Sequence, residues 1–561
     1  MIDIMLPCLK SLIGYKTIPN ILTEAERNSF EYQLEDGTST KLFDNDGKIV
    51  PKGLAYVNNI LEEVYKQLFR HYICMDTRNK QAPNPVKTNE LHKLVLSVPN
   101  TFTPKHHALL KDIAKSFFPM LHPEYLQVVS ESDAVACYYL SRRRDFYGNA
   151  DFLTPQRKSE LDANEHVLVF DMGAGTLDLT YFEKSNCEGK MCISMKGKMG
   201  MNKAGNYLDY LLGEILCDLL EQTNIAEQKK LAFRQRLEID KSRRIMQNTN
   251  KRSCEELKLF VRDKVKPMLN DDTARIPSFN SDYTFENFTM EDIKGHSKYK
   301  AYIKECTEDV LDNLISLFAE GGDTGDYMVQ PQRTSFPLDV VVFSGRSTTL
   351  MDIRNSVSRY IMELENGKEV LCADLNTLTL SPISDIRTDL ENVTSLKTVV
   401  TFGSLIYADW INRPNLFSFT GKKVFADYGL LVKHVTRGWE WFPLITNRSA
   451  EMSSVANPFE VPVLFKGECI YPIDEAKEII FVQNYSKNTA RDWENGNKDL
   501  ITEIVHFDVP NGVNGNQKIS IEIDANNTIT CKIQQFGKIT LEPHDDFHNE
   551  SLRKSLWPVA F

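Results

Sequence analysis

LVFDMGAGTLDL, residues 168–179, is the stretch of sequence that decides how this chain folds. The apolar run 167–170 predicts a β-strand that ends at Asp171, because short runs of Val, Leu and Phe are typical of buried strands. Residues 173–176 predict a tight turn, and a second strand is expected from Leu177 to Phe182. We therefore expect a β-hairpin whose bend contains glycine.

The composition of this bend suggests that it binds an anion. Gly173, Ala174 and Gly175 let the backbone approach a bulky group, and successive N–H groups in such a turn form an anion-binding concavity. A carboxylate at the end of the preceding strand, here Asp171, suits a hydrated magnesium ion beside phosphates. We therefore expect the bend, which closes with Thr176, to clasp the phosphates of ATP. An ordinary hairpin with glycine in its turn is the alternative.

The composition is that of a globular protein with more than one domain. A chain of 561 residues is too long for a single hydrophobic core. Its hydrophobic content of 42% and charged content of 25% are ordinary. The net charge of −11 argues against nucleic-acid binding, which needs a positive surface to neutralise phosphates.

Neither a membrane nor an oxidising compartment is indicated. No apolar run approaches the roughly 18 residues that a membrane span needs. Residues 1–12 are too short and wrongly flanked for a secretory signal. The eleven cysteines are scattered, and the closest pair, Cys187 and Cys192, has no matching second pair for a zinc site or a disulfide framework. A cytoplasmic location is therefore expected.

Strands and helices alternate before about residue 420, which predicts a mostly parallel sheet with its ligand at the carboxyl ends of the strands. Besides the hairpin, strands are expected at 94–99, 126–130 and 338–343. Helices are expected at 104–118, 131–140, 206–220, 229–247, 292–318 and 398–412. Beyond residue 421 the helical period is lost, and short strands are expected at 429–435, 478–483, 503–509, 518–523 and 528–534. This tail is interpreted as a β-sandwich.

The order of these segments resembles that of the seventy-kilodalton heat-shock chaperones, the heat shock protein 70 family. The motifs that carry the resemblance are SVPNTF, VVSESDAVACYY, VFDMGAGTLDLTYF, KAGNYLD, IDKSRRIMQ, DVVVFSGRSTT and VVTFGSLIYA, and in the tail KISIEIDANNTITCKI. The resemblance implies an α/β actin-like (ribonuclease H-like) ATPase domain over residues 1–415. It also implies an all-β sandwich over 421–545 that resembles a peptide-binding domain, then a short tail, 546–561, without a helical lid.

The resemblance assigns roles around the phosphates and the metal. Asp171 and Glu131 would hold magnesium, and Lys10, in LKSLIGYK, would reach the transferring phosphate. The second phosphate loop would be formed by Gly173, Ala174, Gly175 and Thr176, with Asp178 behind it. Phosphoryl transfer requires mostly positioning and neutralisation of charge, and these groups meet part of that requirement. A surface lysine and a helix N-terminal carboxylate are the ordinary alternatives for Lys10 and Glu131.

The resemblance also assigns an adenosine site. The residues implied are Gly205, Asp240, Arg243, Arg244, Ser344, Gly345 and Arg346. Gly205 would pack beside the nucleotide, and residues 344–346 would back the ribose and base. An arginine can stack on a base and still face water, so Arg243 and Arg244 suit the adenine; a solvated charged helix is the alternative.

Departures from the family pattern predict impaired catalysis. The family places a first phosphate loop well ahead of its conserved lysine, whereas Lys10 is the tenth residue here. We therefore expect an N-terminally incomplete ATPase domain in which only the strands near 94–99 and 126–130 remain of the first lobe's sheet. Two such strands would leave an exposed apolar edge.

Three functions remain open. The first is a divergent chaperone that binds ATP or ADP with Mg²⁺, hydrolyses ATP weakly or not at all, and engages unfolded or extended polypeptide, with co-chaperones as further partners. The second is a nucleotide-binding scaffold or regulator without chaperone activity. The third is a pseudo-ATPase that acts only as an interaction module.

Overall fold

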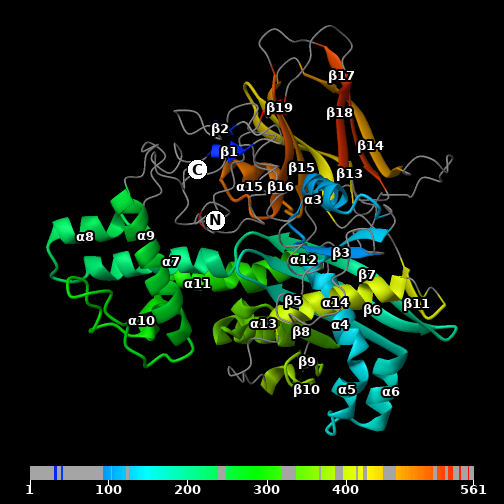
Figure 1. Ribbon diagram of the computed structural model, residues 1–561, viewed down its shortest axis with the longest axis horizontal. Helices are drawn as coiled ribbons and strands as arrows, with labels where there is room; N and C mark the ends of the chain where they lie inside the picture. The colour runs from blue at the N-terminus through cyan, green and yellow to red at the C-terminus, as the bar shows by residue number, and fades with distance from the viewer. Residues whose placement is uncertain are drawn as a thin grey trace.

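The chain folds into a mixed α/β structure with several separate β-sheets (Figure 1). It is seen in a computed structural model. The residues that the structure describes are 31–33, 39–41, 93–102, 104–121, 125–237, 248–316, 336–365, 368–385, 396–411, 413, 415–420, 426–446, 463–473, 476–509, 515–524, 529–534, 543–544 and 554.

The largest sheet has seven strands in the order β10-β9-β8-β5-β6-β7-β11. Its strands are β5 (Asn164–Met172), β6 (Leu177–Cys187), β7 (Lys190–Met201), β8 (Val340–Ser344), β9 (Leu371–Asp374), β10 (Thr379–Pro382) and β11 (Phe417–Thr420). Strand β5 is central: it pairs in parallel with β8 and antiparallel with β6. The predicted hairpin is confirmed, because β5 and β6 run into residues 173–176 with Met172 opposite Leu177.

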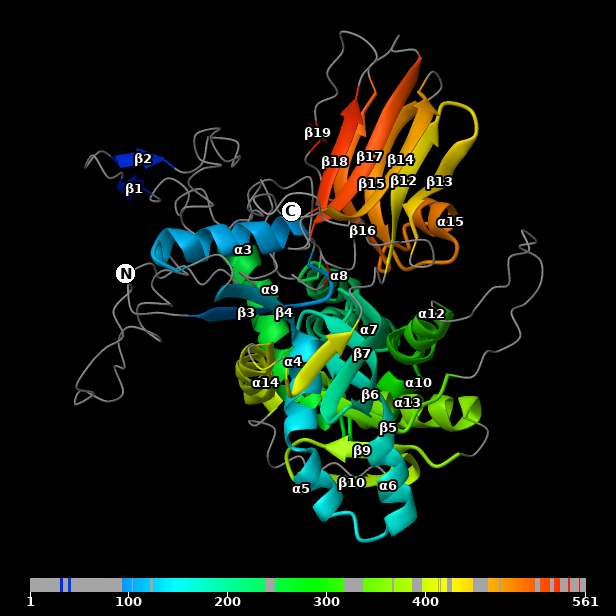
Figure 2. The ribbon, with the colours of Figure 1, turned by 90° about the vertical axis from the view of Figure 1, so that its right-hand side faces the viewer.

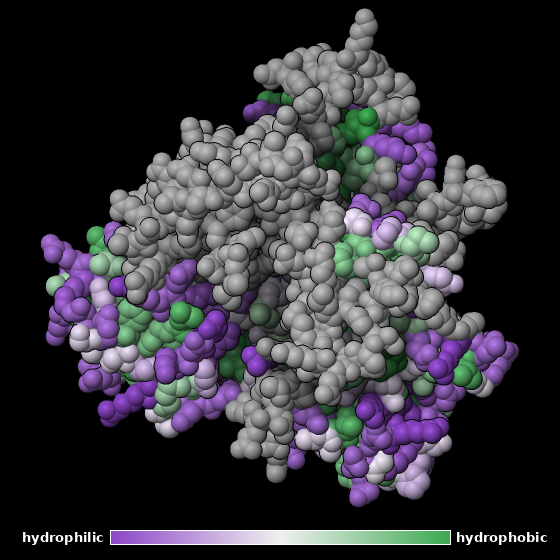
Figure 3. Space-filling model, in the orientation of Figure 1, coloured by the Kyte–Doolittle hydropathy of each residue, from purple (hydrophilic) through white to green (hydrophobic). Residues whose placement is uncertain are grey.

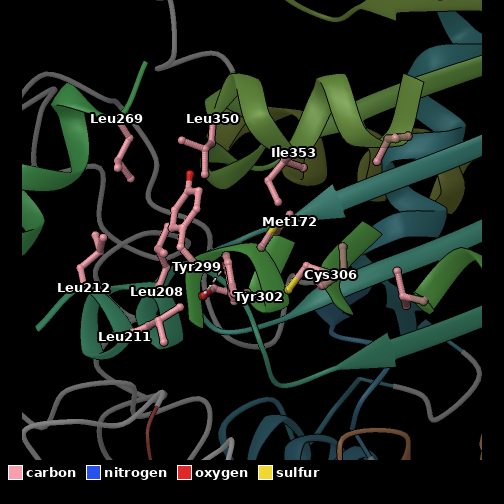
Figure 4. Packing of buried hydrophobic residues seen from close by; sticks show 14 of the residues in the cluster. Met172, Leu208, Leu211, Leu212, Leu269, Tyr299, Tyr302, Cys306, Leu350 and Ile353 are labelled. Carbon is pink, nitrogen blue, oxygen red and sulfur yellow. Dashed lines mark hydrogen bonds between the residues drawn. The ribbon is translucent and has the colours of Figure 1, made fainter. Parts of the chain in front are cut away.

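Helices cover both faces of this sheet because β5 is apolar on both sides. Leu168 and Phe170 belong to one hydrophobic cluster, and Val167 and Val169 belong to another on the opposite face, as the two-residue period of a strand requires. Figure 4 shows Met172, at the end of β5, among residues of the first cluster. That cluster takes residues from α7 (Gly205–Glu221), α11 (Ser297–Lys304) and α13 (Met351–Leu364), whereas the second takes them from α4 (Glu131–Ser141) and α14 (Leu396–Ile411).

A second, small sheet contains the two strands predicted for the first lobe. β3 (Leu94–Val98) and β4 (Leu126–Ser130) pair in parallel, with Leu94 opposite Leu126. Helix α3 (Pro104–Phe117) lies on one side of the pair, and α4 and α14 lie on the other (Figure 2). Among the described strands, β3 and β4 pair only with each other.

The C-terminal region forms two antiparallel sheets, in the orders β13-β12-β15-β16-β19 and β14-β17-β18. The strands are β12 (Asp427–His434), β13 (Gly438–Ile445), β14 (Val463–Pro472), β15 (Ala476–Asn484), β16 (Ile501–Asp508), β17 (Asn516–Asp524), β18 (Ile529–Gln534) and β19 (Pro543–His544). The inner faces of the two sheets share one cluster, in which Leu430 and Phe481 meet Phe465 and Ile521. The five predicted strands are present, whereas β13, β14 and the short helix α15 (Thr489–Glu494) were not predicted.

The remaining elements are short. They are β1 (Glu31–Gln33), β2 (Ser39–Lys41), α5 (Arg143–Gly148), α6 (Pro155–Ala163), α8 (Glu227–Arg234), α9 (Asn248–Phe260), α10 (Met290–Gly295), α12 (Val310–Ser316), and the π or 3₁₀ turns η4 (Val261–Val265), η5 (Lys266–Met268), η6 (Glu305–Asp309), η7 (Arg346–Thr349) and η8 (Ile383–Asp385). The single helix expected over 292–318 is wrong. His296 is extended, with ψ 138°, and its side chain caps a new helix at Lys298 N–H.

The C-terminal sheets contact the α/β part directly, with α15 and β16 on the nearer side (Figures 1 and 2). Tyr485 and Ala426 are buried in the same cluster as Met172. Lys203, next to α7, forms an ion pair with Asp499 at 3.0 Å. Hydrophilic side chains cover the outer ends of the regions around α8 and around α5 and α6 (Figure 3). No helix in the described part of the chain has the length and apolar character to cross a membrane.

Candidate functional site

The bend between β5 and β6 is closed by its own backbone and held by two other loops. The Gly173 N–H donates to the Thr176 carbonyl at 2.9 Å. The Gly173 carbonyl accepts from the Gly205 N–H at 3.2 Å and from the Ser347 hydroxyl at 2.7 Å. The Ala174 carbonyl accepts from the Asn206 N–H at 2.6 Å. The structure therefore brings together three segments that the sequence singled out separately.

Gly345 is the point at which the loop after β8 touches the end of β5. Its φ of +79° lies in the region that favours glycine. A Cβ on it would lie 2.3 Å from the Met172 carbonyl oxygen and 2.7 Å from Asp171 Oδ1. The parallel register that sets Asp171 opposite Ser344 causes this approach. Arg346, the next predicted residue, is exposed beside this contact.

Gly205 makes the corresponding contact at the start of α7. A Cβ there would lie 2.5 Å from Ser347 Oγ and 3.2 Å from the Gly173 carbonyl oxygen. The absence of a side chain thus lets the first turn of α7 meet both loops. The first amides of a helix have no partners within the helix, and here those of Gly205 and Asn206 donate to the carbonyl groups of the bend.

Three carboxylates gather at the entrance to the bend. Asp171 and Asp178 are opposite each other in the β5–β6 register, and both are buried, at 6% and 1% exposure. Burial raises the pKa of Asp178 well above its usual value, and the charges of Glu131 and Asp171 raise it further. Hydrogen bonds from the Thr176 hydroxyl, at 2.8 Å, and from the Asn100 N–H, at 2.6 Å, act in the opposite direction. Such a group of like charges favours a nearby cation.

Glu131 reaches this group because α4 starts directly after β4. The Ser130 side chain caps the helix by accepting from the Asp133 N–H at 3.1 Å. The Ser132 hydroxyl hydrogen-bonds that of Thr180 on β6 at 2.7 Å, which ties α4 to the strand that carries Asp178. The order of β4, Glu131 and α4 agrees with the sequence prediction.

No protein-family model matches this chain, and no curated protein matches it.

The residues present fit a hydrated magnesium ion and an anionic ligand. Among the described residues, no three His, Cys, Asp or Glu side chains converge closely enough to ligate a metal directly. Magnesium is usually held by only one or two carboxylates and retains several waters. Ser344 Oγ, in the register position opposite Asp171, is buried and has no hydrogen-bond partner among the described residues. A buried hydroxyl of this kind is suited to a water or ligand atom.

Two residues of this region, Lys266 and Asn100, were not predicted from the sequence as site residues. Lys266 donates from Nζ to the Gly205 carbonyl at 2.7 Å and to Asp209 Oδ1 at 2.8 Å, so it sets a cation beside the start of α7. Asn100 lies inside SVPNTF, one of the motifs that carry the family resemblance, and this motif was the one sequence feature that pointed to Asn100. Lys266 follows a π-helical turn 61 residues along the chain from Gly205, and no sequence pattern links the two.

Four predicted site residues cannot be compared with the structure. Lys10, Asp240, Arg243 and Arg244 lie outside the described residues. The role of Lys10 at the transferring phosphate stays a prediction. The roles of Asp240, Arg243 and Arg244 at the adenosine also stay predictions.

Proposed function

We propose that this protein binds adenine nucleotide with Mg²⁺ at the bend between β5 and β6, as a divergent member of the heat shock protein 70 family. One observation supports this most directly. The bend, the start of α7 and the loop after β8 meet at the end of β5, next to the buried carboxylates Asp171 and Asp178. Backbone loops that meet beside acidic groups are what a metal–phosphate ligand needs.

In this proposal each element of the site has a defined task. The amides of Ala174, Gly175 and Thr176 face the phosphates, while Asp171 and Glu131 accept hydrogen bonds from the water shell of magnesium. The loop with Gly345 and Arg346 backs the ribose and base, and Gly205 lets α7 approach them.

Hydrolysis is proposed to be weak or absent. Transfer to water needs a group that orients the attacking water in line with the leaving phosphate. The Thr176 hydroxyl already donates to Asp178 Oδ2 at 2.8 Å, so its proton is committed within the protein. Glu131 is the remaining group to orient water, and one carboxylate performs only part of that task.

The α/β part is proposed to be an actin-like ATPase domain over residues 1–415, and the tail a β-sandwich over 421–545. The single cluster shared by the inner faces of the two C-terminal sheets supports the sandwich. In a chaperone, this sandwich would engage extended polypeptide by strand addition or in an apolar cleft. Co-chaperones are then expected as partners, in the cytoplasm.

A nucleotide-binding scaffold without chaperone activity is the alternative, and the contact between the two parts favours it. Tyr485 is buried in the cluster of the α/β part, and Lys203 pairs with Asp499 across the contact. A sandwich fixed in this way acts as a rigid extension of the α/β part. Suppression of the aggregation of a denatured client protein separates the two: a chaperone slows it in a nucleotide-dependent way, and a scaffold does not.

Thermal unfolding with and without Mg²⁺ and ATP tests nucleotide binding. A ligand at about 100 times its Kd stabilises the folded state by about 2.7 kcal/mol. We expect ATP with Mg²⁺ to raise the Tm of the wild type and to have little effect on Asp171→Asn. The control is Asp151→Asn, an exposed aspartate in the loop before α6, which should respond like the wild type. An equal rise in Tm for Asp171→Asn and the wild type, or none in the wild type at millimolar ATP, would refute the site.

A further inference from the structure

The tip of the β6–β7 hairpin places two cysteines near each other. Strand β6 ends at Cys187, and β7 begins three residues later. The two residues between them, Glu188 and Gly189, have φ values of +53° and +78°. Two successive positive φ values are typical of the tight two-residue turn that joins antiparallel strands.

The register puts both thiols on one face of this hairpin. Ser185 is directly opposite Cys192, and Cys187 is two residues further along the same strand, so its side chain projects to the same side as that of Ser185. Cys187 and Cys192 are thus diagonal neighbours across the ladder. Ser185 Oγ lies 3.6 Å from Cys187 Sγ, so the hydroxyl and the thiol are within hydrogen-bond distance on this face.

The two thiols differ in their access to solvent. Cys187 is exposed, whereas Cys192 is buried, at 9% exposure. Burial raises the pKa of the Cys192 thiol, and the neighbouring Cys187 side chain raises that pKa further. Cys187 is therefore the thiol that a dissolved oxidant reaches first, and Cys192 is its diagonal neighbour on the adjacent strand.

The other described cysteines lack this arrangement. Cys187 is the one exposed cysteine in the part of the chain that the structure describes. Burial raises the pKa of Cys217 to about 12 and that of Cys254 to about 11, which keeps both as unreactive thiols. The hairpin tip is consequently distinct from the cysteines of the core.

We propose that Cys187 and Cys192 are a peroxide-sensitive pair that closes reversibly into a disulfide. In the first step the Cys187 thiolate attacks one oxygen of hydrogen peroxide; the O–O bond breaks, Cys187 becomes a sulfenic acid, and water leaves after protonation. In the second step the Cys192 sulfur attacks the Cys187 sulfur, the S–O bond breaks, and a second water leaves. Two thiols are oxidised to one disulfide while one peroxide is reduced to two waters.

The hairpin end must close locally for this bond to form. Diagonal neighbours in an antiparallel ladder have Cα atoms about 7–8 Å apart. A disulfide needs Cα atoms within about 6.8 Å and Cβ atoms within about 4.5 Å. A bond that requires such an adjustment is readily reduced again, as suits a sensor rather than a structural staple.

Tryptic peptide mapping of the full chain gives a direct test. Lys184, Lys190 and Lys196 place the two cysteines on separate peptides, SNCEGK and MCISMK. The protein is exposed to hydrogen peroxide, unfolded in urea so that N-ethylmaleimide blocks every remaining thiol, and digested without reductant. We expect the two peptides to appear joined, lighter than their sum by two hydrogens, and to separate with dithiothreitol.

Two variants identify the order of the steps. Cys192→Ser cannot complete the second step, so more Cys187 sulfenic acid should be captured by dimedone than in the wild type. The matched control is Cys217→Ser, a buried cysteine on α7, which should form the joined peptides like the wild type. The proposal is overturned if oxidised wild type carries Cys187 as a sulfinic acid or unmodified while Cys192 is still labelled by N-ethylmaleimide.

Discussion

The backbone N–H of Asn100 donates to Asp178 Oδ1 at 2.6 Å, so the segment after β3 holds the carboxylate at the start of β6. The side-chain amide of Asn100 also donates to Ser132 Oγ and to the carbonyl groups of Leu179 and Met199, at 3.0–3.1 Å. One residue thereby connects the small sheet to α4 and to two strands of the large sheet.

Replacing Asn100 by alanine should destabilise the fold. Asn100→Ala removes the donor to the two strand carbonyls, and a buried polar group left without a partner costs about 1–3 kcal/mol. The free energy of unfolding in urea measures the loss. Asn149→Ala is the matched control, since Asn149 is exposed and its side-chain amide donates to the Leu378 carbonyl at 3.2 Å; its effect should stay within about 0.5 kcal/mol. Equal losses for the two variants would contradict the connecting role of Asn100.

Gly345→Ala should be among the most damaging small substitutions in the site. The added methyl group would overlap the Met172 carbonyl and crowd Asp171, at a φ that side chains disfavour. Overpacking and backbone strain together should cost about 3 kcal/mol. Gly148→Ala is the control, because a Cβ on this last residue of α5 meets nothing within 4 Å. That helical variant should be unchanged or more stable by up to about 1 kcal/mol. Urea unfolding measures the stability of both variants. Similar stabilities for Gly345→Ala and Gly148→Ala would show that the space around Gly345 accepts a methyl group.

Asp178→Asn should change how stability depends on pH. Because the pKa of Asp178 is raised in the folded state, the folded protein retains a proton that the unfolded protein releases above the usual value of 3.8. Stability due to this group therefore falls as pH rises through the window between that value and the raised pKa. Asparagine does not titrate, so the variant should exceed the wild type in stability near neutral pH, and the advantage should shrink on acidification. Urea unfolding of both proteins across this pH range measures the difference in stability. A stability advantage of Asp178→Asn that grows on acidification would contradict the raised pKa of Asp178.

Lys203→Met should weaken the contact between the two parts of the chain. The Lys203 side chain is 9% exposed and pairs with Asp499, which is 11% exposed, and with Glu305. Removal of one partner from a buried ion pair costs about 3–5 kcal/mol, and the partial exposure of Glu305 places the expected loss near the lower end, about 3 kcal/mol. Amide hydrogen exchange around residues 499–501 should also accelerate.

The control for that contact is Lys229→Met. Lys229 and Asp282 form a pair at 2.7 Å with side chains 52% and 57% exposed. Such a surface pair contributes little to stability, because water screens the two charges. If Lys203→Met proves no more costly than Lys229→Met, the interface pair is as weak as a surface one.

The sequence was most informative where local pattern and tertiary environment agree. The run 167–170 is apolar on both faces and lies in the centre of the large sheet, and the glycine-containing bend follows it as predicted. Strand β13 was missed because the alternation Trp439, Glu440, Trp441 ends after three residues at Phe442 and Pro443. The helix break at His296 was missed because it depends on a side-chain cap and not on a proline.

The candidate site was predicted in pieces, and its assembly was not. Gly173, Gly205 and Gly345 were each chosen from separate motifs. The structure shows Gly205 bonded to the Gly173 carbonyl and Gly345 packed against Met172 and Asp171. Their contact is set by the parallel register of β5 and β8 and by the start of α7, which are non-local properties. The role of Lys266 could not be predicted, because its partners Gly205 and Asp209 are distant in sequence.

The burial of Tyr485 against the α/β part has a practical consequence for dissecting this protein. Tyr485 and Ala426 come from the C-terminal region, yet both contribute to the cluster that includes Met172, with Tyr428 and Leu500 packed against it. A recombinant fragment that stops before residue 426 would turn this apolar surface toward water. We expect such a fragment to be recovered in inclusion bodies or as soluble aggregates, so nucleotide titrations of this protein should use the intact polypeptide.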